Sequence, residues 1–403
     1  NYERRFIMTF PNETLPKGRK QKTTALYDRF INQGAVMGDS FGLENVLWFA
    51  NNKEDAYEEP TIKRSRSHNY VSKEVINVRE NVGIIEVANF SKHEFKGPDA
   101  RKFLDFIMAG RLPNPGRISL SPMLSYRGKL CGDLTVTCLD ENEFIVFGSG
   151  AAQEMHRRWF ESHLGKFNVN YNNRSDEFHG LSIAGPNSRK VLEKIVREDI
   201  SNEKFKFRDS RRMFVGGVPA IVNRISFTGE LGYEIYVAPH YQIKLYEELI
   251  QAGKEFTIKP FGGRALMSMR LEKNWGAWTL DYRPDFTAKE TGLDTFINWN
   301  KEFIGKENAK KDNSTNKIVP LIVETNEIDV TNNEAVVNGK DSIGYVTSGG
   351  FAHYVNKSVA FTFLDQNKIN YDNKIQIEIN GDLFNCSLIK DSLYDPTGQK
   401  MRS

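Results

Sequence analysis

A ten-residue pattern occurs twice in the first half of this chain. Phe95-Lys-Gly-Pro-Asp-Ala-Arg-Lys-Phe-Leu104 is echoed by Ile183-Ala-Gly-Pro-Asn-Ser-Arg-Lys-Val-Leu192. In each copy a strand-like segment precedes Gly-Pro, and proline is favoured at the first helical position because its missing N–H is not needed there. The pattern predicts two strand–turn–helix units and hence two related αβ lobes, although a common helix start used twice would also explain it.

The last part of the chain has a different pattern, of short alternating strands. Two of these strands end in Asn-Gly, at Asn338-Gly339 and Asn380-Gly381, and Asn-Gly is a strong signal for a two-residue hairpin turn. This predicts a separate all-β module, a small barrel or a jelly roll, after a polar linker at 306–316. The expected strands are 317–324, 336–339, 343–347, 358–364 and 375–381.

Composition excludes several classes of protein. The net charge of +3 over 403 residues is too small to indicate a nucleic-acid-binding protein. No apolar run reaches the length of a membrane span, and the mean hydropathy is −0.52, so no membrane segment is expected. Three cysteines without a C-x-x-C pair predict neither a disulfide framework nor a zinc site. The seven histidines show no metal-ligand spacing, so we expect no metal.

Two glycine-rich segments place acids inside apolar strands. In Met123–Val136, Asp133 stands at the start of a strand. In Arg224–Tyr236 two acids, Glu230 and Glu234, and two glycines lie inside an otherwise apolar strand pair. A carboxylate in such a place tends to be buried and then needs partners or has a shifted pKa. Glycines there permit close approach of a ligand. From spacing alone, a strand-edge acid bonded to turn amides and a polar hairpin remain the more frequent explanations.

Both segments resemble the glycine-cleavage T-protein (aminomethyltransferase) family. Arg224–Tyr236 is similar to its R-x-S/T-x-T-G-E-x-G-[YFW]-E signature, and Met123–Val136 to M-L-[NT]-x-x-G-[GK]-x-x-x-D-L-x-V. Gly262–Lys273 resembles the G-x-R-A-x-x-S-[LM]-R-x-E-K run of dimethylglycine and sarcosine dehydrogenases and dimethylglycine oxidase. Segment 16–49, which includes Pro16-Lys-Gly-Arg19, is similar to the junction that follows their flavin domain. The resemblance covers nearly the whole chain, in order.

The resemblance implies a fold and a set of domains. The expected fold is α+β, a three-domain cloverleaf of the T-protein type, with two αβ lobes, a C-terminal small β-barrel or jelly roll, and tetrahydrofolate in the central channel. The first, folate-binding lobe is expected at 1–92 and 177–258, with a junction segment at 1–50. The second lobe is expected at 93–176 and 259–312, and the barrel at 313–403.

The resemblance also implies roles for individual residues. Asp133 falls on the catalytic acid, near the folate nitrogens that take up the one-carbon unit, and Glu234 on the acid that grips the pteridine. A carboxylate suits that task because the pteridine edge offers two adjacent donors. Tyrosines common in the family are replaced here by Phe227 and Leu120, and an arginine by Leu266, for which Arg264 is a candidate substitute. The other residues expected at the folate are Glu230, Met123 and Arg270.

The implied function is the capture of a methyl-derived carbon from an N-methylglycine, dimethylglycine or sarcosine, as 5,10-methylene-tetrahydrofolate. Gly148-Ser-Gly150 lacks the third glycine and the later acid of a dinucleotide fingerprint, so no FAD site is expected in this chain. Oxidation is therefore expected from a flavoprotein domain or subunit, and the start at Asn1 suggests the C-terminal half of a longer flavoenzyme. The expected compartment is the cytoplasm, or the mitochondrial matrix in a eukaryote.

Two alternative functions stay open. One is a folate-dependent demethylase of a sulfonium such as dimethylsulfoniopropionate, which the flavoenzyme-like N-terminal segment disfavours. The other is a non-catalytic folate-binding protein. Related proteins of that kind carry a K-G-C-[YF]-x-G-Q motif, which this sequence lacks, whereas Asp133 is present. Both observations favour an enzyme.

Overall fold

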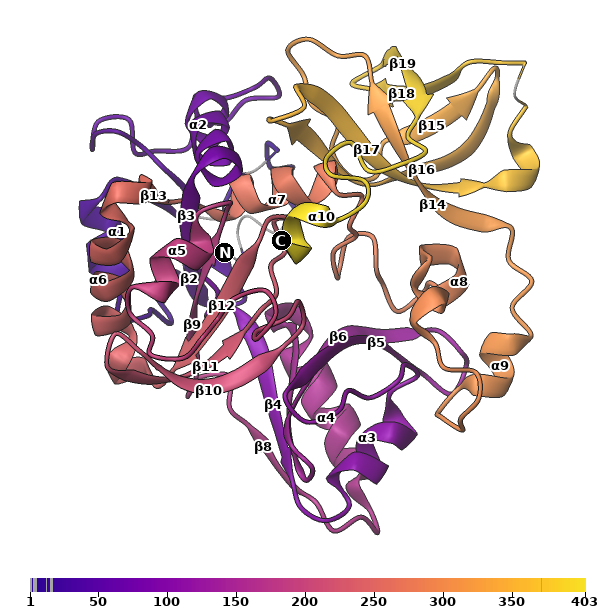
Figure 1. Cartoon of the computed structure of the whole chain (residues 1–403). Helices are drawn as coiled ribbons and strands as arrows, with labels where there is room; N and C mark the ends of the chain where they lie inside the picture. Colours follow the sequence, from indigo (N-terminus) through magenta and orange to yellow (C-terminus); the bar gives the residue numbers. More distant parts are fainter. Residues whose placement is uncertain (1, 3–5, 12, 15–16, 371) are drawn as a thin grey trace.

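The structure is a computed structural model that describes residues 2, 6–11, 13–14, 17–370 and 372–403. Asn1 and Pro16, which belong to the predicted N-terminal junction, lie outside the described residues. Two αβ lobes and a β-barrel surround a common centre (Figure 1). The predicted mixed fold, with two αβ sheets and a C-terminal barrel, is therefore confirmed.

A six-stranded sheet forms the first lobe. Its strands are antiparallel except for the pair between β13 and β3. One face packs on α5 (Ser188–Glu193) and α6 (Gln242–Gly253), and the other on α2 (Ser67–Glu80) and α7 (Gly263–Glu272). The strand order is β10 (Ser210–Val215), β11 (Val218–Asn223), β12 (Gly232–Val237), β9 (His179–Ala184), β3 (Val82–Glu86) and β13 (Ile258–Pro260).

Strand β12 illustrates how alternation positions the site. Successive side chains of a strand point to opposite faces. Tyr233 and Ile235 therefore pack into the core on the α5 and α6 side, whereas Tyr236 packs with α2 and α7. Glu234, two residues before Tyr236, faces the same side as Tyr236.

The second lobe is a five-stranded antiparallel sheet. Its core joins one face of the sheet to α3 (Ala100–Ile107) and α4 (Gln153–Leu164) through side chains such as Phe103 and Phe160. The opposite face is turned toward the first lobe, where Phe147 packs on Tyr236 with ring centres 4.6 Å apart. The strand order is β5 (Arg117–Leu124), β6 (Leu130–Asp140), β7 (Glu143–Ser149), β4 (Phe90–Lys96) and β8 (Asn170–Asn173).

The repeated Gly-Pro pattern forms the same local structure in both lobes. It joins β4 to α3 and β9 to α5, and Gly97 and Gly185 have φ values of 134° and 131°. Few side chains adopt this backbone conformation, which explains the glycine in each copy. The two strand–turn–helix units are thus confirmed, with one correction: Asp99 is the N-cap of α3, so Pro98 precedes the helix instead of opening it.

The C-terminal strands close into a six-stranded barrel. Asn380 and Gly381 have φ values of 52° and 91° and join β18 to β19 in a two-residue turn, as Asn-Gly predicts. The predicted linker is partly helical, because α9 (Lys306–Lys310) occupies its start. The barrel order is β14 (Asn316–Val323), β17 (Lys357–Asp365), β16 (Asp341–Ala352), β15 (Ala335–Asn338), β18 (Ile375–Ile379) and β19 (Asp382–Leu388).

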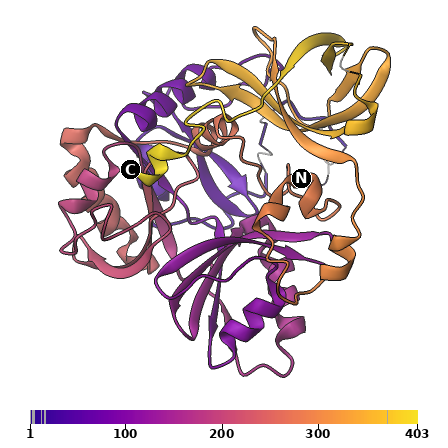
Figure 2. The same cartoon turned by 45° about the vertical axis from the view of Figure 1, so that its right-hand side comes forward.

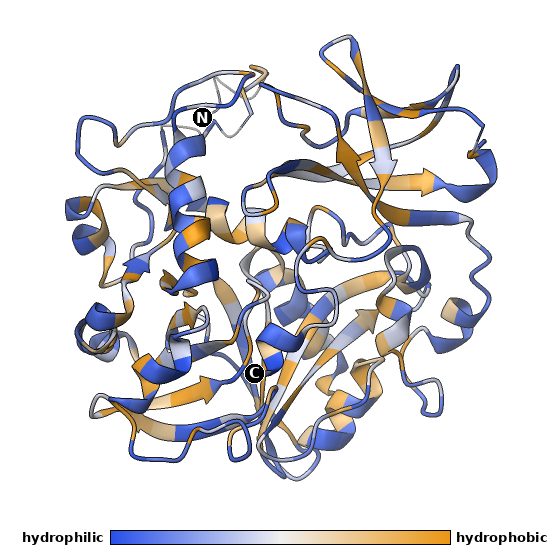
Figure 3. Ribbon diagram, turned by 45° about the horizontal axis from the view of Figure 1, so that its top comes forward, coloured by the Kyte–Doolittle hydropathy of each residue, from blue (hydrophilic) through white to orange (hydrophobic). Residues whose placement is uncertain are grey.

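The C-terminal segment returns from the barrel to the first lobe (Figures 1 and 2). It ends in α10 (Gln399–Arg402), and Ser403 accepts a hydrogen bond from Arg189 of the first lobe at 2.7 Å. Hydrophobic residues gather on the strands and inner helix faces, and hydrophilic residues on the loops (Figure 3). Within the described ranges no helix is long and apolar enough to cross a membrane. The remaining elements are α1 (Tyr27–Asn32), β1 (Ala35–Ser40), β2 (Leu43–Phe49) and α8 (Ala288–Thr291).

Candidate functional site

Asp133 and Glu234 lie on the sheet faces that the two αβ lobes turn toward each other. Asp133 shares one face of β6 with Thr135, because side chains two apart on a strand point the same way. Thr135 pairs with Phe147 of β7, and Phe147 packs on Tyr236. The Tyr236 hydroxyl donates a hydrogen bond to the Glu234 carboxylate at 2.7 Å. Strand pairing, packing of two rings and one hydrogen bond therefore connect the strand that carries Asp133 to Glu234.

The carboxylate of Asp133 has a low-polarity environment. Burial raises its pKa from about 3.8 to about 7, and a hydrogen bond from its own backbone amide opposes this shift. In the part of the chain that the structure describes, no cation forms an ion pair with it and no other side chain donates a hydrogen bond to it. Asp133 is partly buried, and a carboxylate that loses water without gaining a partner is unfavourable, so this carboxylate is suited to receive a ligand.

Glu234 accepts one hydrogen bond, from Tyr236, and is influenced by the charge of Lys92. Burial raises its pKa to about 7, and the Tyr236 hydroxyl and the charge of Lys92 oppose that shift. Neither group forms an ion pair with Glu234 in the described structure, so part of the carboxylate remains available to donors from outside the protein. An ionised carboxylate with a free edge can accept two parallel N–H bonds.

Segment 275–282 reaches from the ring of Phe227 to the surroundings of Asp133. Trp275 stacks on Phe227, with ring centres 5.7 Å apart and planes inclined by 29°. At the other end, Tyr282 lies beside Asp133, whose charge raises the pKa of the buried Tyr282 hydroxyl after burial itself. Sequence reasoning included Phe227 but missed Trp275 and Tyr282, because nothing in a loop sequence indicates which distant residue it contacts.

Three residues predicted at the ligand have protein partners. Glu230 is 2% exposed and pairs with Arg79 of α2 at 2.9 Å, and the Tyr394 hydroxyl also donates to it. Arg270 is paired with Asp281 at 2.8 Å and donates to Ser348 of the barrel. Met123 is fully buried in the core of the second lobe. These contacts join the C-terminal segment, α7 and the barrel around the site.

Leu120 and Arg264 lie in different environments. Leu120 is partly buried against the cluster that includes Tyr282 and Trp278, which places it near segment 275–282. Arg264 of α7 donates to Ser67 Oγ at 2.7 Å and pairs with Glu58 at 3.0 Å.

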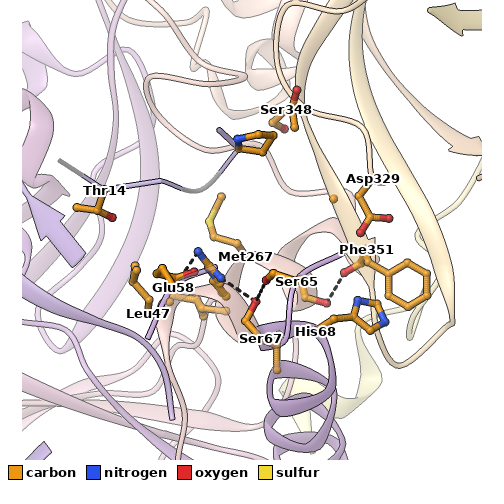
Figure 4. A pocket seen from close by; sticks show the side chains of 18 of the residues that line it. Thr14, Leu47, Glu58, Ser65, Ser67, His68, Met267, Asp329, Ser348 and Phe351 are labelled. Atoms are coloured by element: carbon orange, nitrogen blue, oxygen red, sulfur yellow. Dashed lines mark hydrogen bonds and ion pairs between the residues drawn. The ribbon is translucent and has the colours of Figure 1, made fainter. Parts of the chain in front are cut away.

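A cavity of about 870 Å³ lies between α2, α7 and the barrel (Figure 4). Arg264 lines it, and Figure 4 shows Glu58 and Ser67 beside Met267, with Asp329 and Phe351 of the barrel opposite. Leu280 of segment 275–282 also lines it, so the cavity adjoins the surroundings of Asp133, although neither Asp133 nor Glu234 lies in its wall. The described residues contain no group of three or more His, Cys, Asp or Glu side chains placed to hold a metal ion.

We expect the substitution Glu230→Gln to destabilise the protein. Because Arg79 is buried, removing one of its two carboxylate partners leaves positive charge less compensated, at a cost of about 1–3 kcal/mol. Urea unfolding measures this, with Glu80→Gln at the exposed end of α2 as a control that should leave stability unchanged. Wild-type stability combined with weakened tetrahydrofolate binding would instead place Glu230 at the ligand.

Comparison with known proteins gives the family. Residues 26–301 match the GCVT N-terminal domain, and residues 316–395 match the glycine cleavage T-protein C-terminal barrel domain. The chain belongs to the glycine cleavage T-protein family. The resemblance inferred from the two acid-containing segments is thereby confirmed.

The relatives of this T-protein-family chain include two kinds of named protein. It is 32% identical to mitochondrial dimethylglycine dehydrogenase from Mus musculus over 96% of the chain but 45% of that relative. It is 28% identical to an aminomethyltransferase from Thermoanaerobacter pseudethanolicus over 80% of the chain and 89% of that protein. The chain thus spans about half the length of the curated mammalian relatives.

A solved structure supports the fold. The glycine cleavage system aminomethyltransferase T from Bartonella henselae superimposes with a TM-score of 0.79 at 20% identity, over 93% of this chain and 99% of that one. At this identity the likeness establishes the three-lobed T-protein fold and nothing further.

Proposed function

We propose that this chain transfers a one-carbon unit to tetrahydrofolate, capturing the methyl-derived carbon of dimethylglycine or sarcosine as 5,10-methylene-tetrahydrofolate. The observation that carries this proposal is that two carboxylates, Asp133 and Glu234, lie on the facing sheets of the two lobes, and neither forms an ion pair in the described structure. The match to proteins named dimethylglycine dehydrogenase, at 32% identity over nearly the whole chain, supports an N-methylglycine as the carbon source.

The residues of the site fit tetrahydrofolate. Glu234 can accept the two adjacent donors of the pteridine edge, while Tyr236 fixes one side of the carboxylate. The stacked rings of Phe227 and Trp275 offer an aromatic surface on which the pteridine could pack. Holding the pteridine in one orientation supplies the proximity on which such a reaction depends.

Asp133 has the properties of a general base. Tetrahydrofolate supplies nucleophilic nitrogens for the one-carbon unit. A carboxylate with a pKa of about 7 is near the optimum for accepting a proton from such a nitrogen at neutral pH. Its fixed negative charge also stabilises positive charge that develops on the carbon, and this effect is strong where water is excluded.

The oxidation that releases the carbon is assigned to a partner. We propose that an FAD-dependent dimethylglycine or sarcosine dehydrogenase domain or subunit supplies the iminium or formaldehyde. The mammalian relatives, which are about twice as long as the part that this chain matches, are consistent with such an arrangement.

Product analysis tests the proposal. The protein is incubated anaerobically with tetrahydrofolate, dimethylglycine and a stoichiometric amount of a dimethylglycine-oxidising flavoprotein, whose oxidised flavin takes up the two electrons of a single turnover. A matched reaction lacks this chain. We expect 5,10-methylene-tetrahydrofolate to form faster when the chain is present, and free formaldehyde to fall. Formation of 5-methyl-tetrahydrofolate from dimethylsulfoniopropionate alone would instead indicate a demethylase. Folate binding without any acceleration would indicate a non-catalytic binder.

A further inference from the structure

Lys92 is a fully buried lysine in the joint between the two αβ lobes. It belongs to β4 of the second lobe and is 0% exposed. Its Nζ donates to the carbonyl of Ala88 at 2.8 Å and lies 6.0 Å from the centre of the Tyr236 ring in the first lobe. Lysine is almost never fully buried unless it is paired. The burial of Lys92 loses hydration free energy, so its position calls for an explanation.

Two acids of the first lobe influence this ammonium through their charges. Glu234 of β12 is one, and its carboxylate is joined to the Lys92 environment through the hydroxyl of Tyr236. Glu86, at the end of β3, is another and accepts a hydrogen bond from Gln242. Burial raises the pKa of Glu86 to about 7, and the charge of Lys92 opposes that shift.

Two further titratable groups, Asp176 and His179, influence Lys92 from other elements. Asp176, which follows β8, pairs with Lys22 at 2.7 Å. His179 of β9 lies 3.3 Å from Gln242, and burial lowers its pKa. Burial lowers the pKa of Lys92 itself to about 7, whereas the charges of Asp176, Glu86 and Glu234 raise it.

We propose that Lys92 is a positioning residue for the folate site, whose ammonium favours the ionised form of Glu234 near and below neutral pH and thereby lets it accept the hydrogen bonds of the pteridine edge. This inference rests on the proposed function of Glu234. Lys92 does not itself reach the ligand, and acts from behind Tyr236. Removing a nearby positive charge disfavours the ionised form of a carboxylate and raises its pKa. Without Lys92, the binding-competent form of Glu234 would therefore require a higher pH.

The test is the pH dependence of tetrahydrofolate binding, measured by anaerobic calorimetry between pH 6 and 9. Lys92→Met removes the charge, and Lys92→Gln also removes it but keeps a donor for the Ala88 carbonyl. An upward shift of about one pH unit in the binding midpoint, from about 7, gives about fivefold weaker binding at pH 7, with recovery at pH 9. Lys96→Met is the matched control, because Lys96 lies on the same strand but pairs with Glu94 and Glu143. It should leave the profile unchanged.

Three results would overturn the inference about Lys92. A wild-type pH profile in the folded Lys92 variants would overturn the inference, and so would a loss of affinity that is equal at every pH. Failure of both variants to fold would assign Lys92 to the fold alone and would overturn it too. Glu234→Gln separates the two proposals. Unchanged affinity in Glu234→Gln refutes the role of Glu234, whereas weakened affinity there beside normal Lys92 variants refutes only the role of Lys92.

Discussion

Asp133→Asn is expected to bind tetrahydrofolate as tightly as the wild type and to transfer the one-carbon unit about 100- to 10,000-fold more slowly. Asparagine keeps the size and polarity of the side chain, so the pteridine contacts at Glu234 and Phe227 are retained. It cannot accept the proton, and it removes the fixed negative charge beside the reacting carbon. The measurement is single-turnover formation of 5,10-methylene-tetrahydrofolate, together with a calorimetric binding constant.

The pH profile gives the same prediction a second readout. The active form of a general base is the carboxylate, so the wild-type rate should rise with pH and level off above the Asp133 pKa of about 7. Asp133→Asn should lack this rise. Asp140→Asn is the matched control, because Asp140 is the exposed last residue of the same strand. Full turnover in Asp133→Asn, with the rising limb retained, would remove Asp133 from the mechanism.

Local signals in the sequence predicted the parts of the fold that depend on neighbouring residues. The glycine in each Gly-Pro pattern and the Asn-Gly turns are required by backbone conformations that few other residues adopt. Strand pairing depends instead on distant segments, so the sheet orders were accessible only through the family resemblance. Helix α2 could have been predicted from the sequence, because Val71, Val75 and Val78 recur at helical spacing and are buried.

The candidate site was predictable to the same limited degree. Glu230 and Glu234 stand four residues apart in one segment, yet Glu230 is paired with Arg79 and Glu234 is not. Arg79 comes from α2, far away in the sequence, so no local pattern separates the structural acid from the one available to a ligand. Tyr236 was not predicted at the site, although it lies two residues after Glu234 on the same face of a strand.

Glu234→Gln is expected to weaken tetrahydrofolate binding by on the order of 100-fold. A carboxylate accepts hydrogen bonds from both adjacent pteridine donors, whereas the glutamine amide presents an N–H to one of them and carries no charge. Charge-assisted hydrogen bonds are about twice as strong as neutral ones, so the loss is large for a change of one atom. Anaerobic calorimetry at pH 8, above the Glu234 pKa of about 7, measures it.

Tyr236→Phe provides a graded comparison for the same carboxylate. It removes the hydroxyl that bonds Glu234 at 2.7 Å while the ring still packs on Phe147, so we expect weakening of about 3- to 10-fold, as for one lost hydrogen bond. The order of affinities should be wild type, Tyr236→Phe, then Glu234→Gln. Equal affinity for wild type and Glu234→Gln would mean that the pteridine binds elsewhere. We would then test the cavity beside Arg264 and Met267 as the folate site, because Leu280 of segment 275–282 lines it and Glu234 does not.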